Sequence, residues 1–289
     1  LFKNHKLKLD YKKNRLSIEG KGKVKIEDKF DEVKYLIIKN KDNFDLTSSL
    51  NLENFTLKKR QFLNNFFPNI DQNIIFKDHI LNVNYNKNTL SLSGKGKVKI
   101  DDVFEKIDYF ITKNQNKFDF DVGLNLNQSK FEITQLNYHK KNKSNFQLKI
   151  IGNFEQGKNL NLKKINIIEK NNKIKIDNLI LGNDYRIIKI NEANFDYVDI
   201  ENKLNQFNLK KLSKNNYELE GLAFNANSLI TNILDEKNKK EDNIYESNLI
   251  LNLNIDEVYI DEIYFVKNLK GKISIQNNKV INSEISANF

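Results

Sequence analysis

The chain has 289 residues, of which 39% are hydrophobic and 30% charged, with 20 Phe, 11 Tyr and no cysteine. The aromatic content excludes a disordered chain, and the lack of cysteine excludes disulfides, thiol catalysis and thiolate zinc sites. The net charge of +10 comes from lysines scattered along the chain rather than from one basic block, which favours a solvated face over a nucleic-acid site. We therefore expect a folded protein without bound nucleic acid.

A duplication dominates the first half of the chain. Residues 7–52 align without gaps with residues 81–126 at an offset of 74, and 24 of the 46 positions are identical. A repeat of this kind predicts stacked copies of one supersecondary unit. We divide the chain into a first β repeat unit (1–74), a second β repeat unit (75–150) and a continuing β-sheet region (151–289).

Inside each copy, apolar and polar residues alternate. The shared segment Ser-x-x-Gly-Lys-Gly-Lys-Val-Lys-Ile, at residues 17–26 and 91–100, places Gly, Val and Ile on one face and lysine on the other. A period of two is typical of strands, because successive side chains point to opposite faces. With the turn that precedes each segment, residues 7–26 and 81–100 are predicted to form two equivalent hairpins.

Further strands are predicted along the rest of the chain. The segments with strand alternation are 44–52, 117–126, 131–138, 146–154, 160–168 and 174–181. Apolar residues at helical spacing then predict one short amphipathic helix over 226–234, with Asn225 as its N-cap. From Leu249 the alternation returns and continues to the last residues. The chain starts and ends within strand patterns, so we expect it to be a segment of a longer protein.

No motif indicates catalysis, a metal or a cofactor. The glycines of Gly-Lys-Gly-Lys lie inside a strand pattern that no helix follows, which excludes a phosphate-binding loop and marks a bend or a close approach to the backbone. His5, His79 and His139 are interpreted as isolated residues in different parts of the repeat rather than as metal ligands. The acidic pairs at 27–28 and 101–102 are interpreted as solvated turns. We expect no enzyme activity.

The predicted fold is mainly β: a long, curled, antiparallel-rich sheet built from repeated hairpins, with an apolar groove of taco or gutter shape. Packing two sheets into a sandwich, or stacking them as a β-solenoid, is the alternative, in which the chain is a non-catalytic scaffold or surface protein without a ligand. The residues predicted to line this groove are Ile18, Val24, Leu92, Val98, Leu249, Leu251, Leu253, Ile255, Ile273 and Ile275.

The chain also resembles a known family over most of its length. Its residues 217–226, its alternating segment 249–260 and its segment 268–275 resemble AsmA-like proteins of the YhdP and TamB type, specifically the group with a DUF3971 region. The resemblance implies a bridge that carries phospholipid acyl chains between the inner and outer membranes of Gram-negative bacteria. It also implies a periplasmic location and an inner-membrane anchor in a segment not present in this chain.

Overall fold

The computed structural model describes residues 1–41, 43–60, 63–64, 66–227, 248–261, 263–276 and 279–288. It is 73% strand and 2% helix, which confirms the mainly β fold predicted from the alternation. The chain divides into two compact units. Unit 1 contains residues 1–129 and 153–156, and unit 2 contains residues 130–152 and 157–289.

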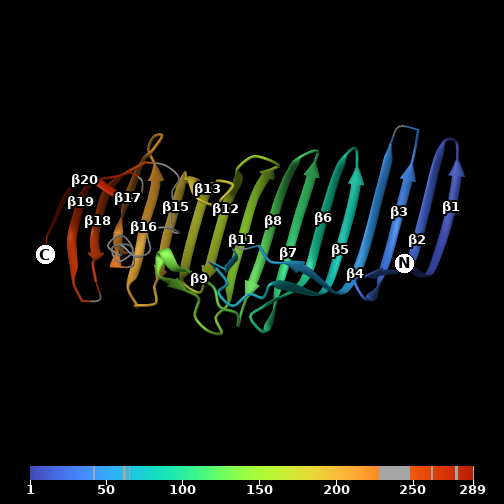
Figure 1. Ribbon diagram of the computed structural model, residues 1–289, viewed down its shortest axis with the longest axis horizontal. Helices are drawn as coiled ribbons and strands as arrows, with labels where there is room; N and C mark the ends of the chain where they lie inside the picture. The colour runs from blue at the N-terminus through green and yellow to red at the C-terminus, as the bar shows by residue number, and fades with distance from the viewer. Residues whose placement is uncertain are drawn as a thin grey trace. The chain divides into compact units, whose positions relative to one another are not determined.

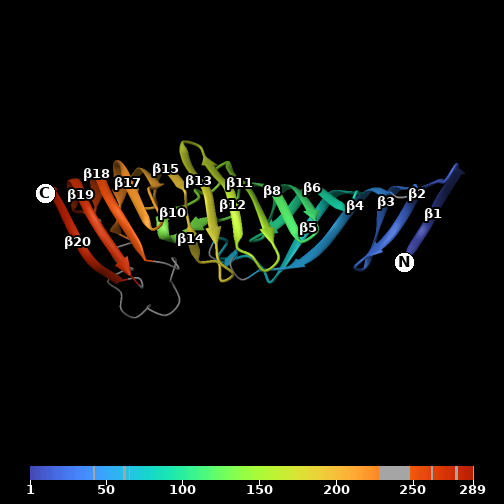
Figure 2. The same cartoon turned by 90° about the horizontal axis from the view of Figure 1, so that it is seen from above.

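Unit 1 is an antiparallel sheet in which each strand from β1 to β8 pairs with the next strand of the chain (Figure 1). Its strands are β1 (Phe2–Lys12), β2 (Arg15–Ile26), β3 (Lys29–Lys39), β4 (Phe44–Lys58), β5 (Asn73–Asn86), β6 (Thr89–Ile100), β7 (Val103–Asn114) and β8 (Lys117–Leu126). Seen from above, these strands form one layer (Figure 2). The two predicted hairpins are β1–β2 and β5–β6, which are confirmed.

The turns of the two hairpins have the same geometry. Lys13 and Asn14 of the first hairpin have φ values of 43° and 64°, and the equivalent Lys87 and Asn88 of the second hairpin have φ values of 45° and 66°. Two central residues with positive φ define a type I′ turn, whose twist matches that of paired strands. The acidic pairs at 27–28 and 101–102 form the turns that follow β2 and β6.

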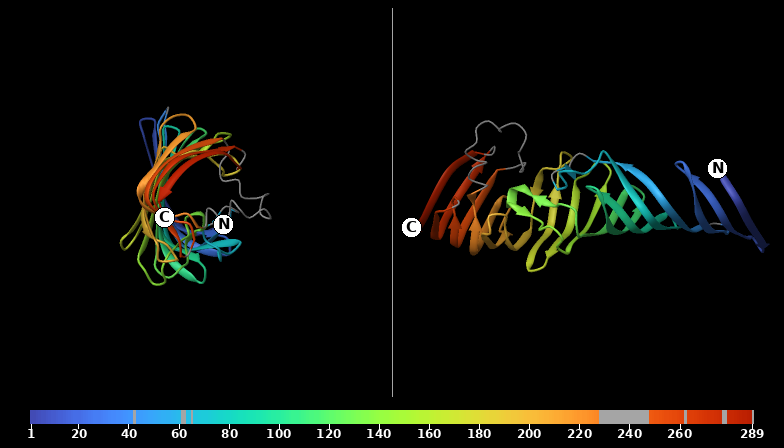
Figure 3. Two further views of the ribbon diagram at one scale, coloured as in Figure 1. Left: turned by 90° about the vertical axis from the view of Figure 1, so that its left-hand side faces the viewer. Right: turned by 90° about the horizontal axis from the view of Figure 1, so that it is seen from below.

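Unit 2 contains a mixed sheet. Its elements are β9 (Glu132–Ile133), the 3₁₀ helix η2 (Thr134–Leu136), β10 (Tyr138–His139), β11 (Phe146–Glu155, its last residues in unit 1), β12 (Leu160–Glu169), β13 (Asn172–Leu181), β14 (Ile187–Lys189), β15 (Glu192–Val198), β16 (Leu204–Lys211), β17 (Asn216–Asn225), β18 (Leu249–Tyr259), β19 (Phe265–Gln276) and β20 (Lys279–Asn288). Between β12 and β20, β17 and β18 form a parallel pair and the other described pairs are antiparallel. The C-terminal strands of unit 2, orange and red in Figure 3, bend along their length.

Two local predictions differ from the structure. The single strand expected over residues 131–138 is wrong: Thr134–Leu136 form a 3₁₀ turn, and Asn137 is left-handed with φ of 50°. This reversal lets Tyr138 pair back with Ile133, so the segment forms the small hairpin β9–β10. The helix expected over 226–234 lies almost entirely outside the described residues. At its start, the Asn225 side-chain oxygen accepts a hydrogen bond of 3.1 Å from the Asn227 backbone N–H, as an N-cap does.

Candidate functional site

One face of the unit 1 sheet is apolar from strand to strand. Cross-strand partners on this face form rows, and one row consists of Gly20, Tyr35, Ser48, Val83, Leu92, Ile111 and Phe120. The apolar side chains of this row are half-buried, so part of each still contacts water. Covering them with another apolar surface would be favourable, because it removes that contact. We call this surface the unit 1 apolar face.

The opposite face of unit 1 is charged. Lys21, Lys23 and Lys25 alternate with the apolar residues of β2 and are exposed, as the alternation predicted. This face also has a few exposed apolar residues, such as Phe110 at 50%. On β2, the lysines and the apolar side chains therefore lie on opposite surfaces.

Aromatic rings lie against the two glycines of each repeat. A Cβ atom on Gly94 would be 2.1 Å from Tyr109 Cζ, and one on Gly96 would be 2.2 Å from His79 Nδ1. The first repeat has the same arrangement, with Gly20 against Tyr35 and Gly22 against His5. A side chain at these positions would displace a ring, so glycine is needed there. The predicted close approach to the glycine backbone is confirmed, and the rings belong to the apolar face itself.

The predicted groove residues of unit 1 lie on this apolar face. Ile18 pairs with Leu9 and Ile37, and Leu92 pairs with Val83 and Ile111. Ile18, Val24 and Leu92 are half-buried, whereas Val98 is only 5% exposed. The open part of the face therefore includes the first three residues, while Val98 is packed by the protein's own atoms.

The predicted groove residues of unit 2 lie on β18 and β19. Leu249 pairs with Ile275, and Leu251 pairs with Ile273. These four side chains are half-buried, but Leu253 is 9% exposed and Ile255 only 1%. The face thus changes along β18 from partly open at its start to fully packed near its end.

The segment from 130 to 145 packs against β12 and β15 of unit 2. Glu169, which is 1% exposed, accepts a hydrogen bond of 2.7 Å from the Tyr138 hydroxyl and another of 2.7 Å from the Lys141 N–H. Tyr138 packs edge-on against Tyr197, whose hydroxyl donates to the Leu136 carbonyl. Burial, followed by the bond to Glu169, raises the pKa of Tyr138. These contacts attach the segment to the sheet, so we interpret them as structural.

Each repeat of unit 1 also contains a buried carboxylate that sequence reasoning missed. Glu105 is 5% exposed and accepts hydrogen bonds of 2.8 to 3.0 Å from the N–H groups of residues 127–129. Asp31, 74 positions earlier and 3% exposed, accepts one of 2.7 Å from the Glu53 N–H. Burial works to raise the pKa of Glu105, but the backbone hydrogen bonds outweigh burial and hold it below its usual value. Asp31 and Glu105 are separated by the 74-residue offset of the repeat, and this equivalence was the signal in the sequence that could have identified them.

The histidines need a correction. The assignment of His5 and His79 to different parts of the repeat is wrong, because they are 74 positions apart and both stack on a tyrosine ring of the repeat. Their ring centroids lie 5.6 Å from Tyr35 and 5.9 Å from Tyr109, respectively. His139 instead pairs with Glu132 at 3.2 Å. In the described parts of the chain, no cluster of three potential metal ligands is found.

Comparison of the chain with protein-family models, curated proteins and solved structures finds no match. Among the described residues, no helix combines the length and apolar character needed to span a membrane. The candidate functional site is therefore defined by geometry: the apolar face of unit 1 and the open part of the unit 2 face.

Proposed function

We propose that the chain binds lipids, with acyl chains lying on the apolar sheet faces. The observation that carries the proposal is the row of half-buried apolar side chains across unit 1, from Tyr35 to Phe120. An acyl chain that covers such a row gains about 0.8 kcal/mol for each CH₂ group removed from water. A row of similar side chains also gives a sliding chain similar contacts at each step.

The proposal extends to transport. The chain acts as a segment of an AsmA-like bridge that carries phospholipid between the inner and outer membranes across the periplasm, anchored by a segment outside this chain. Support comes from the resemblance at residues 217–226 and 268–275, which lie mostly in β17 and in β19. Rows of half-buried apolar side chains, which still contact water, are also what a path for mobile acyl chains requires.

The first test uses two adjacent residues of β6 that point to opposite faces. Leu92 lies on the apolar face and Ser93 on the charged face, and both are half-buried. Leu92→Glu should lower the amount of phospholipid retained by the purified chain roughly tenfold, because a charge would sit beside the acyl chains. Ser93→Glu, the matched control, should leave retention unchanged. Native mass spectrometry measures the bound lipid.

The scaffold alternative is favoured by one observation, the burial of Ile255, Ile174 and Ala193 to 1% or less in unit 2. Leu251, which is half-buried on the same strand as Ile255, separates the two functions. On the lipid proposal, Leu251→Glu impairs lipid binding while the chain stays folded. Complete unfolding of this variant, together with wild-type protein that neither retains nor rebinds lipid, would establish the scaffold alternative.

A further inference from the structure

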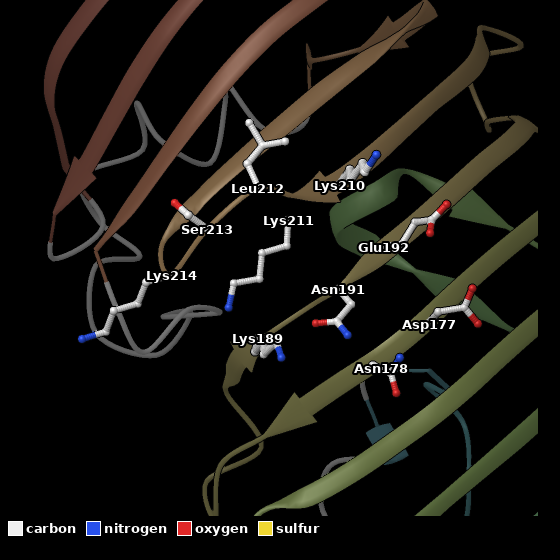
Figure 4. A pocket seen from close by; sticks show the side chains of 10 residues that line it. All are labelled: Asp177, Asn178, Lys189, Asn191, Glu192, Lys210, Lys211, Leu212, Ser213 and Lys214. Carbon is white, nitrogen blue, oxygen red and sulfur yellow. The ribbon is translucent and has the colours of Figure 1, made fainter.

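A polar pocket lies at one end of the strands of unit 2, where β13, β14, β15 and β16 end or begin. Its volume is about 500 Å³, and four lysines and two carboxylates line it. Figure 4 shows the Lys211 side chain extending into the middle of the pocket, with Lys189 and Asn191 beside it. The carboxylates of Asp177 and Glu192 point away from Lys211 in the same view.

The positive charge in this pocket is not neutralised by its own acids. Asp177 is engaged by Lys175, with 2.6 Å between Nζ and Oδ2, and the Glu192 carboxylate accepts a hydrogen bond of 3.4 Å from Asn194. Within the described ranges, no carboxylate lies within ion-pair distance of Lys189 or Lys211. Two ammonium groups without a counter-charge disfavour each other, and an anion between them would relieve this repulsion.

The ionisation of Lys211 agrees with this geometry. Burial, and then the positive charge of Lys189, lower the pKa of Lys211. Both causes act against the charged form of Lys211, and an anion bound between Lys189 and Lys211 would favour the charged form again by offsetting their repulsion. Asn191 and Ser213 add hydrogen-bonding groups to the pocket wall.

The pocket also adjoins the apolar face of unit 2. Lys211 pairs across the sheet with Tyr217, which pairs with Leu251, and Leu251 pairs with Ile273. Cross-strand partners share a face, so Lys211 ends a strand whose earlier residue Leu209 lies on the same apolar side. Tyr217 is only 4% exposed, but Leu251 and Ile273 are half-buried. The row therefore contains a lysine and two partly open apolar side chains, which is the arrangement that an amphiphile with an anionic head requires.

We propose that Lys189 and Lys211 bind the phosphate of a lipid headgroup while its acyl chain lies on Leu251 and Ile273, the half-buried apolar residues of the adjoining row. This inference rests on the proposed lipid function and adds a headgroup site to it. Lysine ammonium groups bind phosphate oxygens by charge-assisted hydrogen bonds. The site would make the chain select lipids that carry phosphate over neutral lipids with the same acyl chains.

The test compares phosphatidic acid with diacylglycerol of the same acyl chains, each delivered to the full chain in neutral detergent micelles. Wild-type protein should retain phosphatidic acid in preference to diacylglycerol. The double variant Lys189→Gln with Lys211→Gln should lower this preference roughly tenfold and leave diacylglycerol binding unchanged. The matched control, Lys270→Gln with Lys272→Gln, removes two exposed lysines of β19 and should keep the wild-type preference. Thermal unfolding verifies that both double variants fold.

Three other outcomes would overturn the headgroup site, the lipid assignment or the proposed function. An unchanged preference in the Lys189 and Lys211 double variant overturns the headgroup site and leaves the proposed lipid function intact. Inorganic phosphate is tested alone: if it binds through the two lysines as tightly as phosphatidic acid does, the pocket is a site for free phosphate and the lipid assignment fails. Wild-type protein that retains neither lipid overturns the proposed function, and the headgroup site with it.

Discussion

The two copies of the repeat in unit 1 share their turns and their strand register but differ in burial. Both have a residue with φ of 52° near the start, Asn4 and Asp78, followed by a shift in pairing register. Phe2 is 65% exposed, whereas its equivalent Phe76 is 9% exposed. The same local sequence therefore gives the same backbone without giving the same packing.

The difference comes from the strand that precedes each copy. Phe55 of β4 stacks on Phe76 with ring centroids 4.6 Å apart and meets His79 edge-on at 5.3 Å. Among the described strands, β1 pairs only with β2, so Phe2 and His5 have no counterpart of Phe55. The comparison teaches that a repeat completes its core with side chains of its neighbour, as in other stacked architectures.

The largest expected difference between the two copies concerns the aromatic cluster of Phe55, Phe76 and His79. Phe76→Ala should lower the free energy of unfolding by about 3 kcal/mol, because it leaves a cavity between Phe55 and His79. Phe2→Ala, the equivalent change in the first copy, should cost less than about 0.5 kcal/mol, because Phe2 is exposed. Urea unfolding measures both. Equal losses would show that β1 is packed in solution as β5 is.

A smaller effect is expected at the buried acids. Glu105→Gln should lower the free energy of unfolding by about 2 kcal/mol, because three backbone N–H groups lose a charged acceptor. Asp31→Asn should cost about 1 kcal/mol, because a single N–H group donates to it. Chemical denaturation of the two variants side by side is the measurement. A larger loss for Asp31→Asn would contradict this ranking.

The smallest effect is a pH dependence that belongs to the second copy. Burial lowers the pKa of His79 below its ordinary value of about 6.5, against an opposing hydrogen bond to the Lys77 carbonyl. A depressed pKa gives stability that is present above about pH 6.5 and is lost as the pH falls through the folded-state value. His79→Phe should flatten the stability profile between about pH 7 and 5.

Much of the sheet could be predicted from the sequence, because alternation reports directly which face each side chain takes. The strand starting at Lys117 and ending at Leu126 was predicted with its observed ends. Alternation failed at residues 131–138, where the left-handed Asn137 reverses the chain, since a pattern of side chains does not encode a change of backbone direction.

The candidate site was less predictable than the sheet. Val24 and Val98 occupy equivalent positions, yet one is half-buried and the other buried, because burial depends on neighbouring strands rather than on the repeat itself. The pocket at Lys189 and Lys211 could not be anticipated, because it combines strand ends and a turn whose lysines look like any other solvated lysines in the sequence.

The offset of 74 residues between the copies also has a consequence for size. Each copy contributes four strands, β1–β4 and β5–β8, and paired strands are about 4.8 Å apart. One duplication event in the gene therefore lengthens the sheet by roughly 19 Å without requiring a new turn or a new register. The length of such a sheet is set by the number of copies, so that evolution can change it in steps of fixed size.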